Sequence, residues 1–231
     1  MVVVETEYVD EDYLLDFKNF YSRSFGPKKC TTGRVHFFPN VTNVQELENN
    51  LFDPSSTKKL NDNYIGFAVV KPVQDRSGKP VIGRTVLRNY PPDAEDHRRI
   101  HIGSPQRCNP FGHELNLWSL PFQSQDTAVG ACTSAALWCA LDQLFHLFEV
   151  QRAPLSQMTA EANKGVMMES RSFPSQGLTT RQMCGYIRMK GLELEYFTIR
   201  NNYAKVNREF ISLALKAYTP AGLPIIANLA M

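Results

Sequence analysis

The first half of the chain shows two hydrophobic periods. Apolar side chains recur every three to four residues over 10–21, which predicts an amphipathic helix. Thr42 and Gln45 form a capping-box pattern that predicts the start of a second helix. Runs rich in β-branched and aromatic residues predict strands over residues 34–38, 64–70, 81–87, 98–103 and 114–118. Pro105 and other breakers separate the last two strands, and the turn-rich residues 75–80 predict a hairpin between the second and third.

The second half has a more helical pattern. Apolar positions predict helices over residues 132–148, 156–163, 179–190 and 203–218. Thr179 and Gln182 form a capping box at the start of the third of these helices, and Gly191 is placed to end it. Two apolar runs that follow the last two helices predict strands over residues 192–199 and 223–229. The whole pattern predicts an α+β protein in which a strand-rich mixed module, residues 1–115, precedes a second domain, residues 116–231.

Composition narrows the class of protein. The chain has 231 residues, of which 43% are hydrophobic and 21% charged, so it can bury a sizeable core. A net charge of +2 argues against nucleic acid as a partner. The sequence shows no secretory signal and no run near the ~20 apolar residues that span a membrane. Five cysteines without a Cys-x-x-Cys pair argue against a disulfide framework or a structural zinc site, so we expect a cytoplasmic protein.

The segment from Gln123 to Cys132 carries the most distinctive chemistry. A polar loop with two glutamines runs into Cys132, which opens a predicted helix. The first turn of a helix has unpaired N–H groups and the positive end of the macrodipole, and both favour a thiolate. An upstream glutamine side chain can donate an N–H group to an oxyanion that forms at an attacked carbonyl. The pattern therefore favours Cys132 as a nucleophile.

The same segment resembles a known family. The motif Gln-Asp-x-x-x-x-Ala-Cys-x-x-Ala-Ala-Leu-Trp, from Gln125 onward, resembles the catalytic start of papain-like cysteine peptidases, most closely the peptidase C39-like branch. Residues 177–195 resemble the helix–glycine–strand unit of that branch, and the whole resemblance covers about residues 118–231. It implies a papain-like domain with Cys132 as nucleophile and Gln125 in the oxyanion hole, with Gln123 as second candidate. It also implies a peptide or protein substrate and no metal or organic cofactor.

The resemblance further implies a histidine, later in the chain than the cysteine, that acts as general base. His146 follows Cys132 by fourteen residues of one predicted helix, which separates them by about 21 Å. His113 precedes the cysteine, in the opposite order to that of the family. In the family the histidine opens a strand that would come just after residue 231. We therefore expect a papain-like domain truncated at its C-terminus, in a fragment whose general base lies beyond residue 231.

Three functions remain open at this point. The leading hypothesis is a cysteine peptidase or amide hydrolase that works through thiolate attack and an acyl-enzyme intermediate. The absence of a suitable histidine supports an alternative, a catalytically inactive papain-like interaction or regulatory protein. A further alternative is an acyl or peptide transferase that uses the same cysteine. The N-terminal module provides a possible site for a protein partner.

Overall fold

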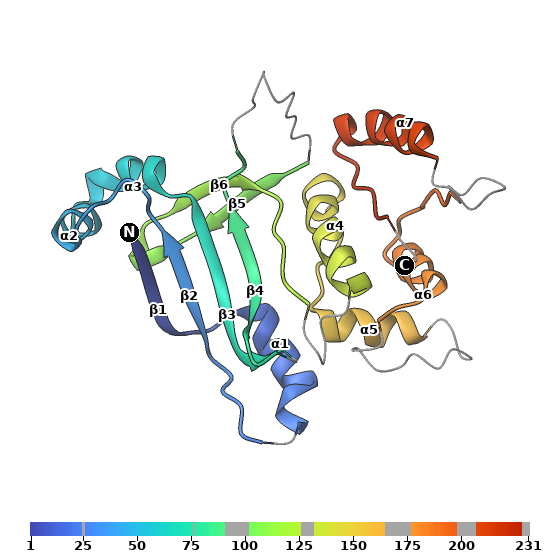
Figure 1. The fold of residues 1–231 in the computed structure, drawn as a ribbon, viewed down its shortest axis with the longest axis horizontal. Helices are drawn as coiled ribbons and strands as arrows, with labels where there is room; N and C mark the ends of the chain where they lie inside the picture. The colour runs from blue at the N-terminus through green and yellow to red at the C-terminus, as the bar shows by residue number, and fades with distance from the viewer. Residues whose placement is uncertain are drawn as a thin grey trace.

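The computed structural model describes residues 1–24, 26–75, 77–90, 102–125, 132–164, 177–197 and 207–227, which form a mixed α+β structure (Figure 1). An antiparallel sheet has the strand order β1 (Val2–Tyr8), β2 (Thr32–Phe37), β3 (Gly66–Gln74), β4 (Pro80–Leu87). A separate antiparallel pair consists of β5 (Ser104–Cys108) and β6 (Leu115–Ser119). The α-helices are α1 (Glu11–Asn19), α2 (Val44–Phe52), α3 (Thr57–Asn63), α4 (Cys132–Phe148), α5 (Leu155–Lys164), α6 (Thr180–Met189) and α7 (Arg208–Tyr218). Strands β1 to β4 lie in the left half of Figure 1, and helices α4 to α7 in the right half.

The hairpin predicted around residues 75–80 is confirmed and joins β3 to β4. The Asp75 carboxylate accepts hydrogen bonds from the backbone N–H groups of Ser77 and Lys79. Gly78 has a φ of 80°, a conformation that glycine adopts without steric cost. Local turn chemistry therefore sets the register of the two strands.

Both helices predicted in the first half are present, but the second begins one residue later than its capping box indicates. Asp10 is the N-cap of α1 and accepts a hydrogen bond from the Tyr13 N–H group at 2.9 Å. The box predicted from Thr42 is wrong by one position, because Asn43 is the N-cap and accepts from the Glu46 N–H group at 2.8 Å. The Glu46 carboxylate reaches back to the Thr42 N–H group. The asparagine side chain thus takes the capping role that the pattern gave to threonine.

The strand predicted over 98–103 is displaced along the chain. Residues 98–101 lie outside the described residues, while residues 102–103 are irregular. The strand β5 begins immediately after them and includes Pro105, which pairs with Trp118 although the sequence pattern marks this proline as a breaker. A two-stranded sheet leaves one edge of β5 without a partner strand, and proline is tolerated on such edges.

The helices of the second half follow their predictions closely. α4 and its predicted range have the same bounds, and α6 has both bonds of the capping box between Thr179 and Gln182. Gly191 follows α6 with a φ of 79°, as a glycine that ends a helix does. α7 begins at Arg208, and residues 203–206 of its prediction lie outside the described residues.

The two strands predicted over 192–199 and 223–229 are wrong where the structure describes them. Residues 192–197 and 223–227 are irregular, and no described strand lies beside them to complete a ladder. An apolar run favours a strand only if a second strand supplies its hydrogen-bond partners, which the sequence of one segment cannot specify. The α+β class is therefore confirmed, while the papain-like assignment stays a prediction.

Two hydrophobic cores hold the described residues together. The first lies between the four-stranded sheet, α2, α3 and the β5–β6 pair, and includes Phe38, Leu60, Tyr64, Phe67, Val69 and Leu115. The second includes Tyr13, Val73 and Val81 from the strand-rich half and Leu137, Met158 and Tyr186 from the helical half. The boundary predicted between residues 115 and 116 falls at the start of β6 and stays a prediction. The second core shows that α4 packs directly on elements from both sides of it.

Candidate active site at Cys132

Cys132 is the first described residue of α4, and it is exposed. The helix is held by its buried face, which carries Leu137, Trp138 and Leu141. The strong helix formers alanine and leucine recur along this face. Cys132 therefore lies at the end of the helix where backbone N–H groups have no intrahelical acceptor.

Cys132 and Gln125 share one site. The Cys132 Sγ–H group donates a hydrogen bond to Gln125 Oε1 at 3.0 Å, and both side chains are exposed. Residues 126–131 between them lie outside the described residues. A primary amide has both an acceptor and a donor, so rotation of the Gln125 amide would present Nε2–H to a thiolate or to a nearby oxyanion. The structure brings together the two residues that the sequence nominated, while their chemical roles stay predictions.

Gln123, the second oxyanion candidate, is directed elsewhere. It is buried, and its Oε1 accepts a hydrogen bond from Lys71 Nζ at 3.4 Å. Its backbone is hydrogen-bonded to the Cys139 side chain on α4. Gly83 makes room for the Lys71 side chain, since a Cβ atom there would lie 3.0 Å from Lys71 Cε. These contacts hold the Gln123 side chain toward β3 and favour Gln125 as the oxyanion donor.

Three of the five histidines are described, and each is engaged away from Cys132. Their hydrogen-bond partners are the Tyr64 hydroxyl and Glu5 carboxylate for His36, the Thr57 hydroxyl and Leu51 carbonyl for His113, and the Arg152 guanidinium for His146. His97 and His101 lie outside the described residues. No histidine in the described ranges is hydrogen-bonded to the candidate nucleophile.

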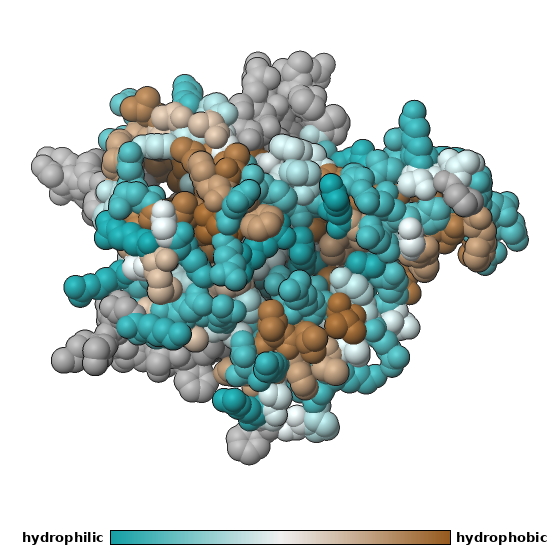
Figure 2. Space-filling model, turned by 180° about the vertical axis from the view of Figure 1, so that it is seen from behind, coloured by the Kyte–Doolittle hydropathy of each residue, from teal (hydrophilic) through white to brown (hydrophobic). Residues whose placement is uncertain are grey.

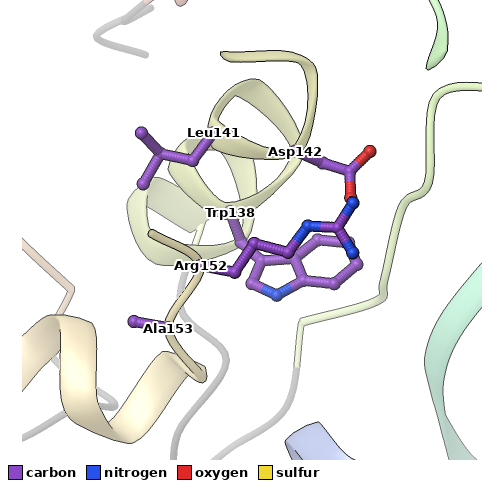
Figure 3. A pocket seen from close by; sticks show the side chains of 5 residues that line it. All are labelled: Trp138, Leu141, Asp142, Arg152 and Ala153. Carbon is purple, nitrogen blue, oxygen red and sulfur yellow. The ribbon is translucent and has the colours of Figure 1, made fainter. Parts of the chain in front are cut away.

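Asp142 anchors α4 to the β5–β6 sheet. Its side chain is 2% exposed, and Oδ2 accepts hydrogen bonds from Ser104 Oγ at 3.0 Å and from Gln106 Nε2 at 2.9 Å. Arg152 Nη2 lies 2.9 Å from Oδ1, as an ion pair rather than a well-aligned hydrogen bond. Figure 3 shows the Arg152 side chain reaching toward Asp142, and both line a small pocket together with Trp138, Leu141 and Ala153. The same helix that presents Cys132 is therefore fixed by charge-assisted contacts.

Sequence reasoning missed this anchor. Asp142 follows Leu141 in a stretch of α4 that is otherwise mostly apolar. A carboxylate on the buried face of a helix needs partners, because an unpaired buried charge is costly. The single acidic residue in this apolar stretch therefore indicates a buried, paired carboxylate, although the sequence does not identify its partners on β5.

Asp12 on α1 is a second acidic residue whose surroundings alter its pKa. Burial raises the pKa of Asp12 to about 6, and the neighbouring carboxylate of Asp10 adds to this rise. The positive charges of Arg84 and Lys71 oppose the rise but do not cancel it. The folded protein therefore bears a cost for the ionised form of Asp12 above about pH 6.

Replacing Asp12 by asparagine should stabilise the protein at high pH. The pKa rises from 3.8 to about 6, so the cost of the carboxylate at pH 8 is at most about 3 kcal/mol. As pH falls toward 4.5, the folded protein takes up this proton, and the gain from the substitution should shrink to about 1 kcal/mol. Urea unfolding of Asp12→Asn at both pH values measures the difference. Equal gains at the two pH values, or a gain matched by the exposed control Asp62→Asn, would contradict the assignment.

Comparisons with protein-family models, with curated proteins and with solved structures find no match to this chain. None of the helices in the described residues has the length and apolar content needed to cross a bilayer. In the same ranges, no three His, Cys, Asp or Glu side chains gather in a way that could hold a metal ion. The function is therefore argued from the geometry around Cys132.

Proposed function

We propose that this protein is a cysteine-dependent acyl hydrolase, a cysteine peptidase or amide hydrolase, with Cys132 as its nucleophile. The observation that carries the proposal is the hydrogen bond between Cys132 and Gln125 at the exposed start of α4. A thiol there is accessible to substrate, faces the positive end of a helix and has an amide beside it. The resemblance to papain-like peptidases agrees with this arrangement.

The proposed reaction passes through a thioester. The Cys132 thiolate attacks the carbonyl carbon of a peptide or amide, and the C=O electron pair moves to the oxygen. The turned Gln125 amide and the backbone N–H of Cys132 stabilise this oxyanion. Its collapse expels the amine, which takes a proton from the general acid, and water then hydrolyses the thioester to restore the thiol. The base that first accepts the thiol proton has to be a group other than the three described histidines.

Competition between two cysteines of the same molecule tests the activation of Cys132. Cys30 is also exposed but lies outside any helix, so it serves as an internal control. At pH 7 we expect iodoacetamide to modify Cys132 about tenfold faster than Cys30, because the helix terminus and the Gln125 amide stabilise the thiolate. Mass spectrometry of the two cysteine peptides after timed quenching gives both rates. A Cys132 rate no higher than that of Cys30 would remove the support for a nucleophile.

A catalytically inactive interaction protein is the second candidate. It is favoured by the engagement of His36, His113 and His146 in contacts away from Cys132. In such a protein, the bond between Cys132 and Gln125 would only hold these two residues together. The cysteine competition tests activation alone, because both candidates keep Cys132 at a helix terminus. Hydrolysis of an acyl group from Cys132 separates them, because an inactive protein does not turn over its thioester.

A further inference from the structure

One face of the four-stranded sheet is lined by apolar side chains. The register pairs Val2 with Phe37, Val4 with Val35, and Val35 with Ala68. Residues directly opposite each other in neighbouring strands project from the same side of a sheet, so these five share one face. The same face continues through Ala68 and Val70 of β3 and through Leu87 of β4. Phe122, which follows β6 in the chain, forms a β-bridge with Thr85 and lies on this face too. We call it the open face, and it consists of Val2, Val4, Val35, Phe37, Ala68, Val70, Leu87 and Phe122.

The open face is accessible. Val2, Val4 and Phe122 are 60%, 55% and 47% exposed, and the other members are partly exposed. In Figure 1 no described helix is drawn in front of the four strands. From the opposite side, Figure 2 shows a largely hydrophilic surface on which hydrophobic residues gather in separate groups. An apolar sheet face without a covering layer is typical of an interaction surface.

The paired centre of the open face has no charge, while Glu7 lies at the β1 bulge near its end. The remaining paired positions on it are Gly33, Gly66, Gln74, Pro80, Ile82 and Thr85, and the bulge of β1 sets Thr6 and Glu7 opposite Gly33. The other face carries an ion pair, in which Arg34 and His36 both contact the Glu5 carboxylate. This reverses the usual arrangement, in which the polar side chains of an antiparallel sheet face solvent. Because a slip of one residue would exchange the two faces, the ion pair between Glu5 and Arg34 helps to keep the apolar side outward.

We propose that the open face binds the open face of a second copy of this chain, so that two sheets pack face to face in a homodimer. A mainly apolar face is complementary to itself, since a two-fold interface brings together identical patches. Two twisted sheets can pack along their whole faces at a separation of about 10 Å. A flat lipid surface would meet only part of a twisted sheet, which favours a second copy over a membrane as the occupant.

The size of the face sets the expected affinity. Four strands about 4.8 Å apart, each contributing about six residues, give a face of roughly 20 Å by 20 Å. Two such faces bury on the order of 800 Å², below the range of stable interfaces and in that of weak, transient ones. The dimer should therefore be reversible and depend on concentration in the micromolar range. It does not rest on the chemistry proposed for Cys132.

Sedimentation velocity of the full chain tests this interface. Between about 1 and about 200 μM, we expect the weight-average mass to rise from 26.2 kDa toward twice that value. Val4→Lys places a charge on the open face at a position that is already mostly exposed, and should weaken dimerisation at least roughly tenfold. Phe52→Lys is the matched control, because Phe52 is 84% exposed on α2, outside the open face, and its substitution should leave the dimer unchanged. If circular dichroism shows that Val4→Lys does not fold, Phe122→Lys takes its place.

Three results would overturn the proposal. The first is a wild-type chain that stays at 26.2 kDa over the whole concentration range. The second is a dimer that Val4→Lys and Phe122→Lys leave intact, or that Phe52→Lys weakens equally. The third is a monomer that co-sediments with neutral phosphatidylcholine vesicles and loses this binding in Val4→Lys, which would assign the open face to lipid.

Discussion

Replacing Asp142 by alanine should lower the free energy of unfolding by about 3 kcal/mol or more. The substitution removes the carboxylate that accepts from Ser104 and Gln106 and that pairs with Arg152. Ser104 and Gln106 are themselves buried, so their donors would be left without this acceptor in a region that water reaches poorly. Urea denaturation at pH 7, followed by circular dichroism, measures the loss.

Two variants make this prediction specific. Asp142→Asn keeps the size and one acceptor but removes the charge, so it should lose less stability than the alanine variant. Glu48→Ala removes an exposed carboxylate from the middle of α2 and should change stability by no more than about 0.5 kcal/mol. An Asp142→Ala variant as stable as Glu48→Ala would show that the carboxylate does not anchor α4.

Replacing Gln125 by alanine should slow acylation of Cys132 by roughly a hundredfold to a thousandfold. The expected cause is the loss of one of two oxyanion donors, while the thiol stays in place. The burst of p-nitrophenol released from an activated acetate ester measures the acylation rate. This ester suits the test because p-nitrophenolate leaves without a proton, so the assay does not depend on the identity of the general acid.

Gln123→Ala is the matched comparison, since Gln123 is the other glutamine before Cys132. Its amide faces Lys71 in the structure, so the variant should acylate within about twofold of the wild-type rate once corrected for the folded fraction. The reverse order, with Gln123→Ala slow and Gln125→Ala unchanged, would transfer the oxyanion role to Gln123. Equal rates in both variants and the wild type would leave neither glutamine with that role.

The sequence predicted those features that depend on neighbouring residues. The bounds of α4, the capping box at Thr179 and the turn at Asp75 all follow from local patterns, and the structure has each of them. The proximity of Gln125 to Cys132 was also predictable, because they lie only seven positions apart in the sequence. Local hydrogen bonds and helical periodicity decide these features, and both are visible in a single sequence.

Features that depend on distant partners could not be predicted in this way. The runs over 192–197 and 223–227 have strand-like composition, yet no described strand pairs with them. β5 tolerates Pro105 because, among the described strands, it has a partner on one edge only. This depends on how the strands are arranged in the sheet and not on the sequence of β5 itself. The contacts of Asp142 with β5 and of Lys71 with Gln123 join residues 36 to 52 positions apart. Tertiary packing chooses such partners, and one sequence does not reveal them.

The central claim is that Cys132 is a nucleophile, and the site of acylation tests it most directly. The wild-type chain is treated with p-nitrophenyl acetate and digested, and the peptides that contain Cys132 and Cys30 are weighed by mass spectrometry. We predict an acetyl group on Cys132 that forms in the burst phase, is lost again by hydrolysis and is absent from the Cys132→Ala variant. Acetylation spread equally over Cys132 and Cys30, or none on Cys132, would contradict the account.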